Sequence, residues 1–127
     1  MLTPVGKSKT IREDILLLGT AKGLEIIETS NIIRIEAISN YCKLFFVDGK
    51  TLVVAKLLSW FELKLSPCRF SRLHRSHLVN INYIRAYNNI ESNEVVLTTG
   101  EQLMVARRKR TQFRKALQAF YAGGRAA

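Results

Sequence analysis

The sequence predicts a mainly β protein with short helices, an α+β fold of packed antiparallel sheets. Short apolar segments recur along most of the chain between Gly, Asn and Asp turn signals, which is typical of sandwich-like or barrel-like packing. Apolar residues at helical spacing occur in two places, one internal and one near the C-terminus. The length of 127 residues fits one domain. We expect this domain at residues 11–121, between a flexible lead-in at residues 1–10 and a flexible tail at residues 122–127.

The expected strands are short runs of β-branched, aromatic or other apolar residues bounded by turn residues. In chain order they are residues 15–18, 24–28, 32–37, 41–47, 51–55, a segment that starts at Phe70, 84–90, 95–98 and 102–105. A glycine-containing turn at residues 19–23 closes the first hairpin. Asp48-Gly49 is a strong two-residue turn signal for the second hairpin, and residues 91–93 close a later one.

Two helices are expected. The first spans apolar residues at helical spacing from 57 to 65, and it must end by Ser66 because Pro67 disfavours helical geometry in the residue before it. The second begins near Lys109 and is ended by Gly123-Gly124. Its apolar face is formed by Phe113, Leu117 and Phe120.

Basic residues are in large excess and are unevenly distributed. The chain has 20 Lys and Arg against 10 Asp and Glu, a formal net charge of +10. Residues 69–85 contain four Arg and no acid, and residues 101–127 contain seven basic residues and one acid. A fold that brings these two segments together would form one footprint for phosphates. The alternative is a solvated basic surface that keeps the protein soluble.

The most informative segment is residues 70–80, which alternates Arg and His with apolar residues that must be buried. It reads Phe70-Ser71-Arg72-Leu73-His74-Arg75-Ser76-His77-Leu78-Val79-Asn80. Such alternation holds the charges at fixed positions on a folded surface. Fixed cations suit an ordered anionic partner, and the commonest is duplex nucleic acid.

Three groups of residues are candidates for this contact. Arg75 lies where the chain should leave a strand, and its planar fork of donors can bridge two acceptors on a guanine edge or a phosphate. Ser76 and Asn80 suit phosphate hydrogen bonds or local caps. Arg107-Arg108-Lys109-Arg110 lies at an expected strand-to-helix junction, next to a helix N-terminus that attracts phosphate. Asn40, Tyr41 and Lys43 form a third polar point, although each could be only a turn or surface residue.

These motifs resemble the LytTR DNA-binding domain family of bacterial transcription regulators over roughly residues 13–119. The resemblance rests on Ile35-Glu36-Ala37, Asn40-Tyr41, Asp48-Gly49, the amphipathic stretch to Leu65, residues 70–76, Val79-Asn80, Ile84, Gly100 and Leu103-Met104-Val105-Ala106-Arg107-Arg108. It implies a β fold that reads double-stranded DNA with loops and strand ends. Two positions depart from the family pattern: His77 replaces a frequent aromatic residue, and Ala106 replaces a frequent Ser.

The resemblance also implies a role for each candidate residue. The expected base-reading residues are Asn40, Lys43, Arg75 and Arg107. The expected phosphate contacts are Tyr41, Arg72, Ser76, His77, Arg108, Lys109 and Arg110. His74 and Asn80 are expected to orient the others. A monomer in solution should pair on repeated DNA sites, as the output domain of a two-component response regulator or behind a sensor. Because about ten residues cannot form a receiver, the chain would be either stand-alone or part of a longer protein.

Other classes of function have little support in the sequence. There is no nucleophile elbow and no glycine-rich phosphate loop, so we expect neither an enzyme nor a cofactor. Cys42, Cys68, His74 and His77 lack the paired spacing of zinc ligands, and both cysteines are expected to be free thiols. Neither a signal peptide nor a membrane-spanning segment is expected, so we predict a cytoplasmic protein.

Two alternatives remain open. A small basic β-rich module could bind RNA or single-stranded nucleic acid on a platform of exposed aromatic residues. The candidates for such a platform are Tyr41, Tyr83, Tyr87 and Tyr121. A protein-interaction module could instead use the basic face to bind acidic partners.

Overall fold

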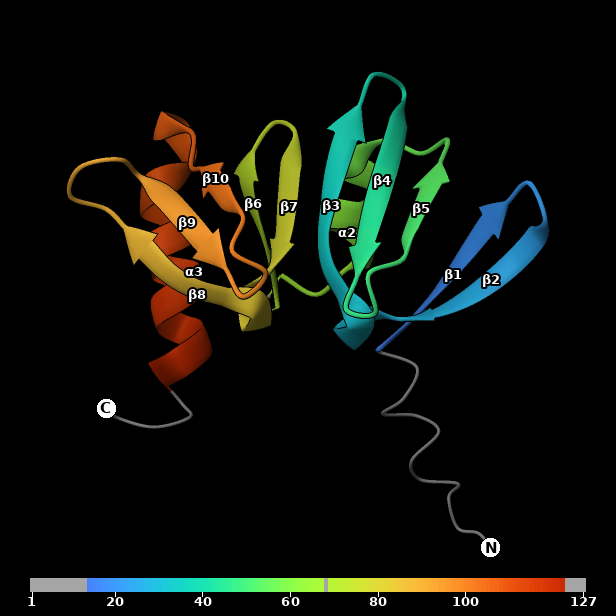
Figure 1. Ribbon diagram of the computed structural model, residues 1–127, viewed down its shortest axis with the longest axis horizontal. Coiled ribbons are helices and arrows are strands. Elements are labelled where there is room, and N and C mark those ends of the chain that lie inside the picture. Colours follow the sequence, from blue (N-terminus) through green and yellow to red (C-terminus); the bar gives the residue numbers. More distant parts are fainter. Residues whose placement is uncertain (1–13, 68, 123–127) are drawn as a thin grey trace, which may run out of the picture.

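The computed structural model describes residues 14–67 and 69–122, and these form ten strands and two α-helices (Figure 1). The strands are β1 (Ile15–Thr20), β2 (Gly23–Glu28), β3 (Ile32–Ile38), β4 (Tyr41–Phe46), β5 (Thr51–Val54), β6 (Phe70–His74), β7 (His77–Asn80), β8 (Ile84–Asn88), β9 (Glu94–Leu97) and β10 (Gln102–Met104). The α-helices are α2 (Leu58–Lys64) and α3 (Arg110–Ala122), and three short 3-10 helices are η1 (Thr29–Asn31), η2 (Ile81–Tyr83) and η3 (Arg107–Lys109). The expected lead-in and the Gly123-Gly124 helix end lie outside the described residues.

The strands form three antiparallel sheets that lie side by side (Figure 1). The central sheet has the order β5-β4-β3-β7-β6, β1 pairs with β2, and the third sheet has the order β10-β9-β8. Each expected hairpin forms, including the tight turn after β4, where Gly49 adopts a φ of +88° that favours glycine. The predicted fold class, with one internal and one C-terminal α-helix, is confirmed.

Two hydrophobic cores lie on opposite faces of the β6–β7 hairpin. Leu78 belongs to a core that includes Phe61 of α2 and the inner face of the β1–β2 hairpin. The adjacent Val79 belongs to a second core that includes Phe113 of α3 and the strands of the β8–β10 sheet. Successive side chains in a strand point to opposite faces, so one hairpin serves both cores. The turn between β6 and β7 is therefore supported by strands that are packed on both faces.

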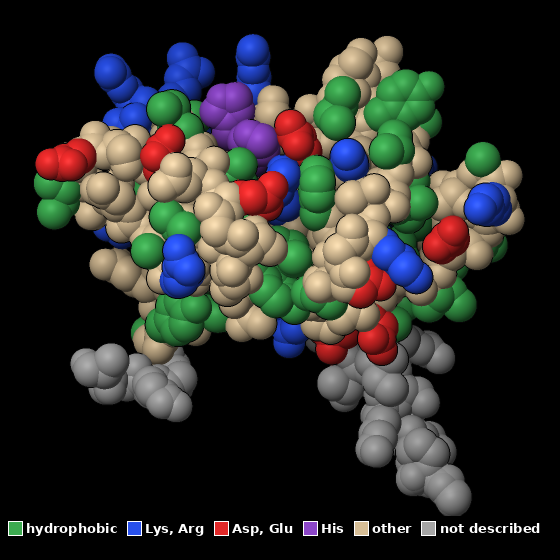
Figure 2. Space-filling model, viewed as in Figure 1, with side chains coloured by type: hydrophobic (Ala, Val, Ile, Leu, Met, Phe, Trp, Pro, Cys, Tyr) green, Lys and Arg blue, Asp and Glu red, His purple; other side chains and the backbone are tan. Residues whose placement is uncertain are grey.

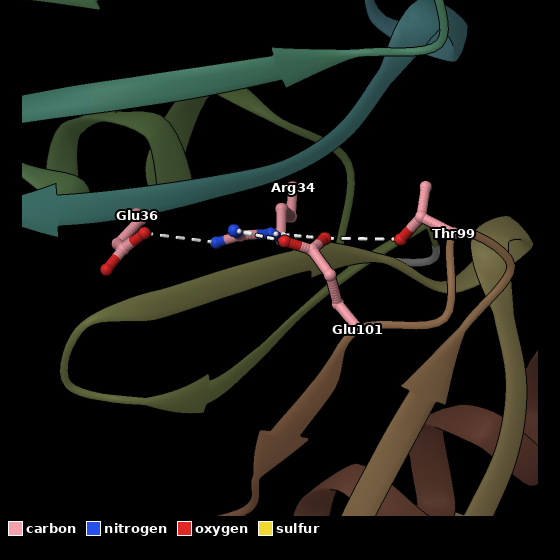
Figure 3. A network of polar contacts seen from close by, with 4 residues as sticks. All are labelled: Arg34, Glu36, Thr99 and Glu101. Atoms are coloured by element: carbon pink, nitrogen blue, oxygen red, sulfur yellow. Dashed lines mark hydrogen bonds and ion pairs between the residues drawn. The ribbon is translucent and has the colours of Figure 1, made fainter. Parts of the chain in front are cut away.

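A partly buried ionic network centred on Arg34 joins the central sheet to the β8–β10 sheet (Figure 3). Arg34 on β3 is only 6% exposed. Its Nε and Nη2 donate to the two carboxylate oxygens of Glu101 at 3.1 and 2.8 Å, and its Nη1 donates to Glu36 at 3.2 Å. The guanidinium carbon lies 3.8 Å from the centre of the Phe45 ring, and Thr99 donates to Glu101. Each of these contacts compensates for the removal of a cation from water.

We predict that Glu101→Gln lowers the free energy of unfolding because Arg34 keeps its charge and loses its main counterion. The loss should be about 1–3 kcal/mol, below the value for a fully buried pair, because Glu101 is 43% exposed. Urea denaturation at pH 7 measures it. Glu36→Gln is the control and should cost less, since it leaves both Glu101 contacts intact. Equal losses in the two variants would contradict the prediction.

The same pair predicts a loss of stability in acid. Hydrogen bonds from Arg34 lower the pKa of the Glu101 carboxyl, against the opposing effect of burial. Since the folded pKa is below the unfolded value, the stabilisation is complete above the unfolded pKa and disappears as the pH falls through the folded one. Glu101→Gln should therefore be closer to the wild type in stability at pH 3 than at pH 7.

Candidate nucleic-acid interface

The turns after β3 and β6 lie at the same edge of the central sheet (Figure 1). β3 and β7 are antiparallel neighbours in which Glu36 pairs with His77, and the backbone N–H of Ala37 donates to the carbonyl of Ser76 at 2.9 Å. The turn after β3 and the turn after β6 both lie within a few residues of the Glu36–His77 pair. The fold therefore brings Asn40 and Arg75 to one edge, although they are far apart in the sequence.

The connection between β10 and α3 reaches the same edge. The backbone N–H of Ala106 donates to the carbonyl of Leu73 at 2.8 Å, which fixes the start of η3 beside β6. The two basic segments thus meet, which is the arrangement that would form one footprint for phosphates. They line an open groove of about 440 Å³ formed by Arg72, His74, Arg75, Ala106, Arg107, Arg108 and Lys109. Figure 2 shows Lys and Arg side chains projecting from this edge beside the histidines.

The predicted site residues divide into free and engaged donors. Within the described residues, no hydrogen bond or ion pair is made by the side chains of Asn40, Tyr41, Arg75, Arg107, Arg108 and Lys109, and all of these residues except the half-buried Lys109 are exposed. Lys43 is half-buried, with its Nζ 5.2 Å from the centre of the Phe45 ring. Arg110 is half-buried and donates to the carbonyl of Val105 at 3.2 Å. The free donors are available to a ligand without breaking a contact within the protein.

Arg72 differs from the other predicted phosphate contacts because all three of its guanidinium nitrogens donate to protein oxygens. Its Nη1 donates to Glu62 of α2 at 2.6 Å. Its Nε and Nη2 donate to the carbonyls of His74 and Arg75 at 2.9 and 2.7 Å. No local pattern predicts the contact with Glu62, because the two residues lie on a helix and a strand that only the tertiary fold brings together.

Asn80 lies at the opposite end of β7 from the Arg75 turn and is 3% exposed. Its Nδ2 donates to the carbonyl of Ile32 at 2.9 Å, and its Oδ1 accepts from the N–H of Asn82 at 3.0 Å. Of the two alternatives for this residue, the structure shows the local cap. Its side chain links β3 to η2 through these two hydrogen bonds and does not line the groove.

The two histidines lie against each other at the base of the Arg75 turn, with ring centres 5.5 Å apart. Nδ1 of His74 accepts the backbone N–H of Ser76 at 3.1 Å, which fixes the turn from inside. Nδ1 of His77 is buried and has no hydrogen-bond partner among the described residues. Burial lowers the pKa of His77; Glu36 and Glu101 raise it, while Arg34 and His74 lower it further. At pH 7 this ring is therefore neutral and adds no cation to the edge.

The described residues offer little for other chemistry. No cluster of three or more His, Cys, Asp or Glu in residues 14–67 and 69–122 could hold a metal ion. Cys42 is a free, buried thiol whose pKa is raised by burial, against a smaller opposing effect of Arg72. Cys68 lies outside the described residues. In the same part of the chain, no helix is long and apolar enough to cross a membrane.

The domain is β-rich and presents side-chain donors without internal partners from three loops at one edge, with free cations on two of them. These features are typical of a nucleic-acid-binding domain. The profile of the LytTr DNA-binding domain matches residues 22–118, and the chain belongs to this family. It is a DNA-binding domain of the kind found in transcription regulators and not an enzyme.

Known proteins that are similar to it include a transcriptional regulator and a solved DNA-binding domain. The CO-responsive transcriptional regulator RcoM of Rhodospirillum rubrum is 26% identical over 132 aligned positions, which cover 92% of this chain and 56% of RcoM. The chain thus spans about half the length of that relative. The LytTr DNA-binding domain of a methyl-accepting/DNA response regulator from Bacillus cereus superposes with a TM-score of 0.69 at 28% identity, covering 82% of this chain and 96% of that domain.

We predict that His77→Phe makes the protein less sensitive to mild acid. Burial lowers the pKa of His77 in the folded state, so the unfolded chain binds a proton at this residue more readily. The contribution of neutral His77 to the free energy of unfolding is therefore complete above the unfolded pKa of ~6.5 and is lost as the pH falls below it. Urea midpoints at pH 7.5 and 5.5 should therefore converge in the variant. An equal loss of stability in wild type and variant over this range would rule out His77 as the source. Glu101 titrates at lower pH and does not interfere.

Proposed function

We propose that this chain is a sequence-specific, double-stranded DNA-binding domain of a bacterial transcription regulator, which reads the major groove with loops and strand ends. The observation that carries this proposal is the convergence of three loops at one edge, each with side-chain donors free of internal partners. Bases are read by donors and acceptors held in fixed positions, and phosphates by cations around them. Both kinds of group occur here within one surface.

Within this proposal, Asn40, Lys43, Arg75 and Arg107 read bases. Arg75 and Arg107 can each offer a bidentate fork to a guanine, and Asn40 can offer a paired donor and acceptor to an adenine. Contacts to phosphate oxygens are made by Tyr41, Ser76, His77, Arg108, Lys109 and Arg110. His77 would make its contact as a neutral donor and not as a cation.

The aromatic residues favour duplex DNA over RNA or a single strand. A stacking platform needs several exposed rings beside the cations. Tyr41 is exposed at the edge, but Tyr87 packs edge-on against Phe113, and the Tyr83 hydroxyl donates to the carbonyl of Ser30. Tyr121 is exposed, but it packs edge-on against Phe120 and lies at the end of α3 that is far from η3. Competition between duplex DNA, single-stranded DNA and RNA at one salt concentration tests this preference, and stronger binding of either single strand would overturn it.

The domain is proposed to act in the cytoplasm, as a free monomer that pairs on repeated sites. RcoM is CO-responsive and almost twice as long as the matched region, which supports a sensor or receiver outside the family domain. A two-component arrangement is the proposed setting. Selection of bound duplexes from a random pool would identify the site and its repeats.

We expect Arg75→Ala and Arg107→Ala each to reduce affinity for the selected site by about 1–3 kcal/mol and to relax preference at one or two base positions. Lys109→Ala is the matched control. It should weaken selected and scrambled duplexes alike and reduce the slope of log affinity against log salt by about 1, because a phosphate contact carries no sequence information. Titrations of both duplexes measure these effects. If Arg75→Ala weakens both duplexes by the same factor, Arg75 only anchors the backbone.

Pairing on DNA predicts a dependence on the spacing of repeats. Two copies on one face of the duplex need sites about one helical turn, ~10 bp, apart. Insertion of about half a turn should weaken joint occupancy in a gel-shift titration, and insertion of a full turn should restore part of it. Occupancy that does not depend on the insertion would show that the copies bind independently.

A further inference from the structure

The guanidinium of Arg72 crosses the base of the Arg75 turn and fastens it to helix α2. Two of its nitrogens hold the carbonyls of His74 and Arg75 at 2.9 and 2.7 Å, and the third holds Glu62 at 2.6 Å. The Arg72 side chain is 18% exposed and that of Glu62 is 43% exposed. Charge-assisted hydrogen bonds in this range are the stronger kind.

We propose that Arg72 and Glu62 are positioning residues that determine DNA specificity by fixing the Arg75 turn, and that Arg72 itself contacts no phosphate. The inference rests on the proposed function, since it assigns a role within the same interface. It differs from the role predicted from the sequence, in which Arg72 is one of several cations that contact phosphates.

The turn needs such support because the strand that carries it is irregular. The pairing of β6 with β7 shifts between Arg72 and His74, so the regular ladder is interrupted just before the turn. The Arg72 side chain adds support at this point by donating to the carbonyls of His74 and Arg75, the two residues that follow the interruption. The ring of His74 holds Ser76 from the other side. The backbone that carries Arg75 is thus fixed before DNA arrives, which lowers the cost of ordering it on binding.

Helix α2 provides a fixed base for Glu62. Leu58 and Phe61 of this helix are buried, and Phe61 packs edge-on against Trp60. A carboxylate on a rigid helix can hold Arg72 in one orientation. Without Glu62, the free nitrogen of Arg72 would be drawn towards water or a phosphate, and its hold on the turn would weaken.

The charge of Glu62 makes the proposal testable. An acid near a DNA-binding edge opposes the attraction of phosphates, so its removal should strengthen binding if charge is all that matters. If Glu62 positions Arg75, its removal should instead weaken binding to the selected site. The two readings predict opposite signs for the same substitution.

The experiment compares the full chain carrying Glu62→Gln with wild type on a selected duplex and its scrambled counterpart at one salt concentration. We expect about a tenfold loss of affinity for the selected duplex and no loss for the scrambled one. Glu91→Gln is the control, because Glu91 is an exposed acid in the β8–β9 turn whose carboxylate has no partner among the described residues. It should not lower affinity for the selected duplex. An increase for both duplexes in Glu62→Gln, as a pure charge effect requires, would overturn the proposal.

Arg72→Lys provides a second test that keeps the charge and removes the fork. The ratio of selected to scrambled affinity should fall about tenfold, while scrambled affinity and its salt slope stay at the wild-type level. Equal weakening of both duplexes together with a reduced salt slope in Arg72→Ala would make Arg72 a phosphate contact and overturn the proposal. Circular dichroism melting checks that each variant is folded. If the wild type itself does not prefer the selected duplex, the proposed function is wrong. If the wild type prefers it and these variants leave that preference unchanged, only the positioning role of Arg72 and Glu62 is wrong.

Discussion

The shape of the proposed DNA-binding edge depends on the contact between the buried Arg34 and the partly exposed Glu101. A guanidinium removed from water needs a counterion in good geometry, and the paired contacts at 3.1 and 2.8 Å supply one from the neighbouring sheet. Glu101 immediately precedes β10, and the chain reaches Arg107 only a few residues later. A fixed Glu101 therefore holds the β10–η3 connection in line with the two turns of the central sheet. This contact acts together with the backbone hydrogen bond from Ala106 to Leu73, which fixes the start of η3 beside β6.

The acids near the edge explain why the free cations stay free. Glu36 and Glu101 bind Arg34, and Glu62 binds Arg72, so each of these carboxylates has an internal partner. Carboxylates left unpaired at this edge would be drawn to Arg75 or Arg107 and would repel phosphates. The internal pairs therefore have two effects. They fix the geometry, and they leave the outer cations uncompensated and able to bind a polyanion.

Local patterns in the sequence predicted the fold because strand and helix signals act over a few residues. Asp48-Gly49 set a hairpin, Pro67 set the end of a helix, and Phe113 identified the buried face of another. The convergence of Arg75 with the residue 107–110 segment could be anticipated from charge and from the family resemblance. The partner of Arg72 could not, since Glu62 is an ordinary surface residue in any local window. The burial of Arg34 could not be predicted for the same reason, because a single Arg within a strand pattern carries no local signal of burial. Burial and pairing are tertiary properties, and they decide which of the predicted cations remain available.

A domain that reads DNA with turns must solve a problem that a recognition helix does not have. A helix fixes its side chains through its own backbone hydrogen bonds, whereas a loop loses conformational freedom when it binds. Here the Arg75 turn is short, its strands are packed between two cores, and side chains of His74 and Arg72 bind its backbone. These contacts fix the turn during folding and not during binding. The hydrophobic cores therefore compensate for the conformational entropy lost in ordering the turn. Under the proposed function, the free energy of the outer contacts then remains available to distinguish one base from another.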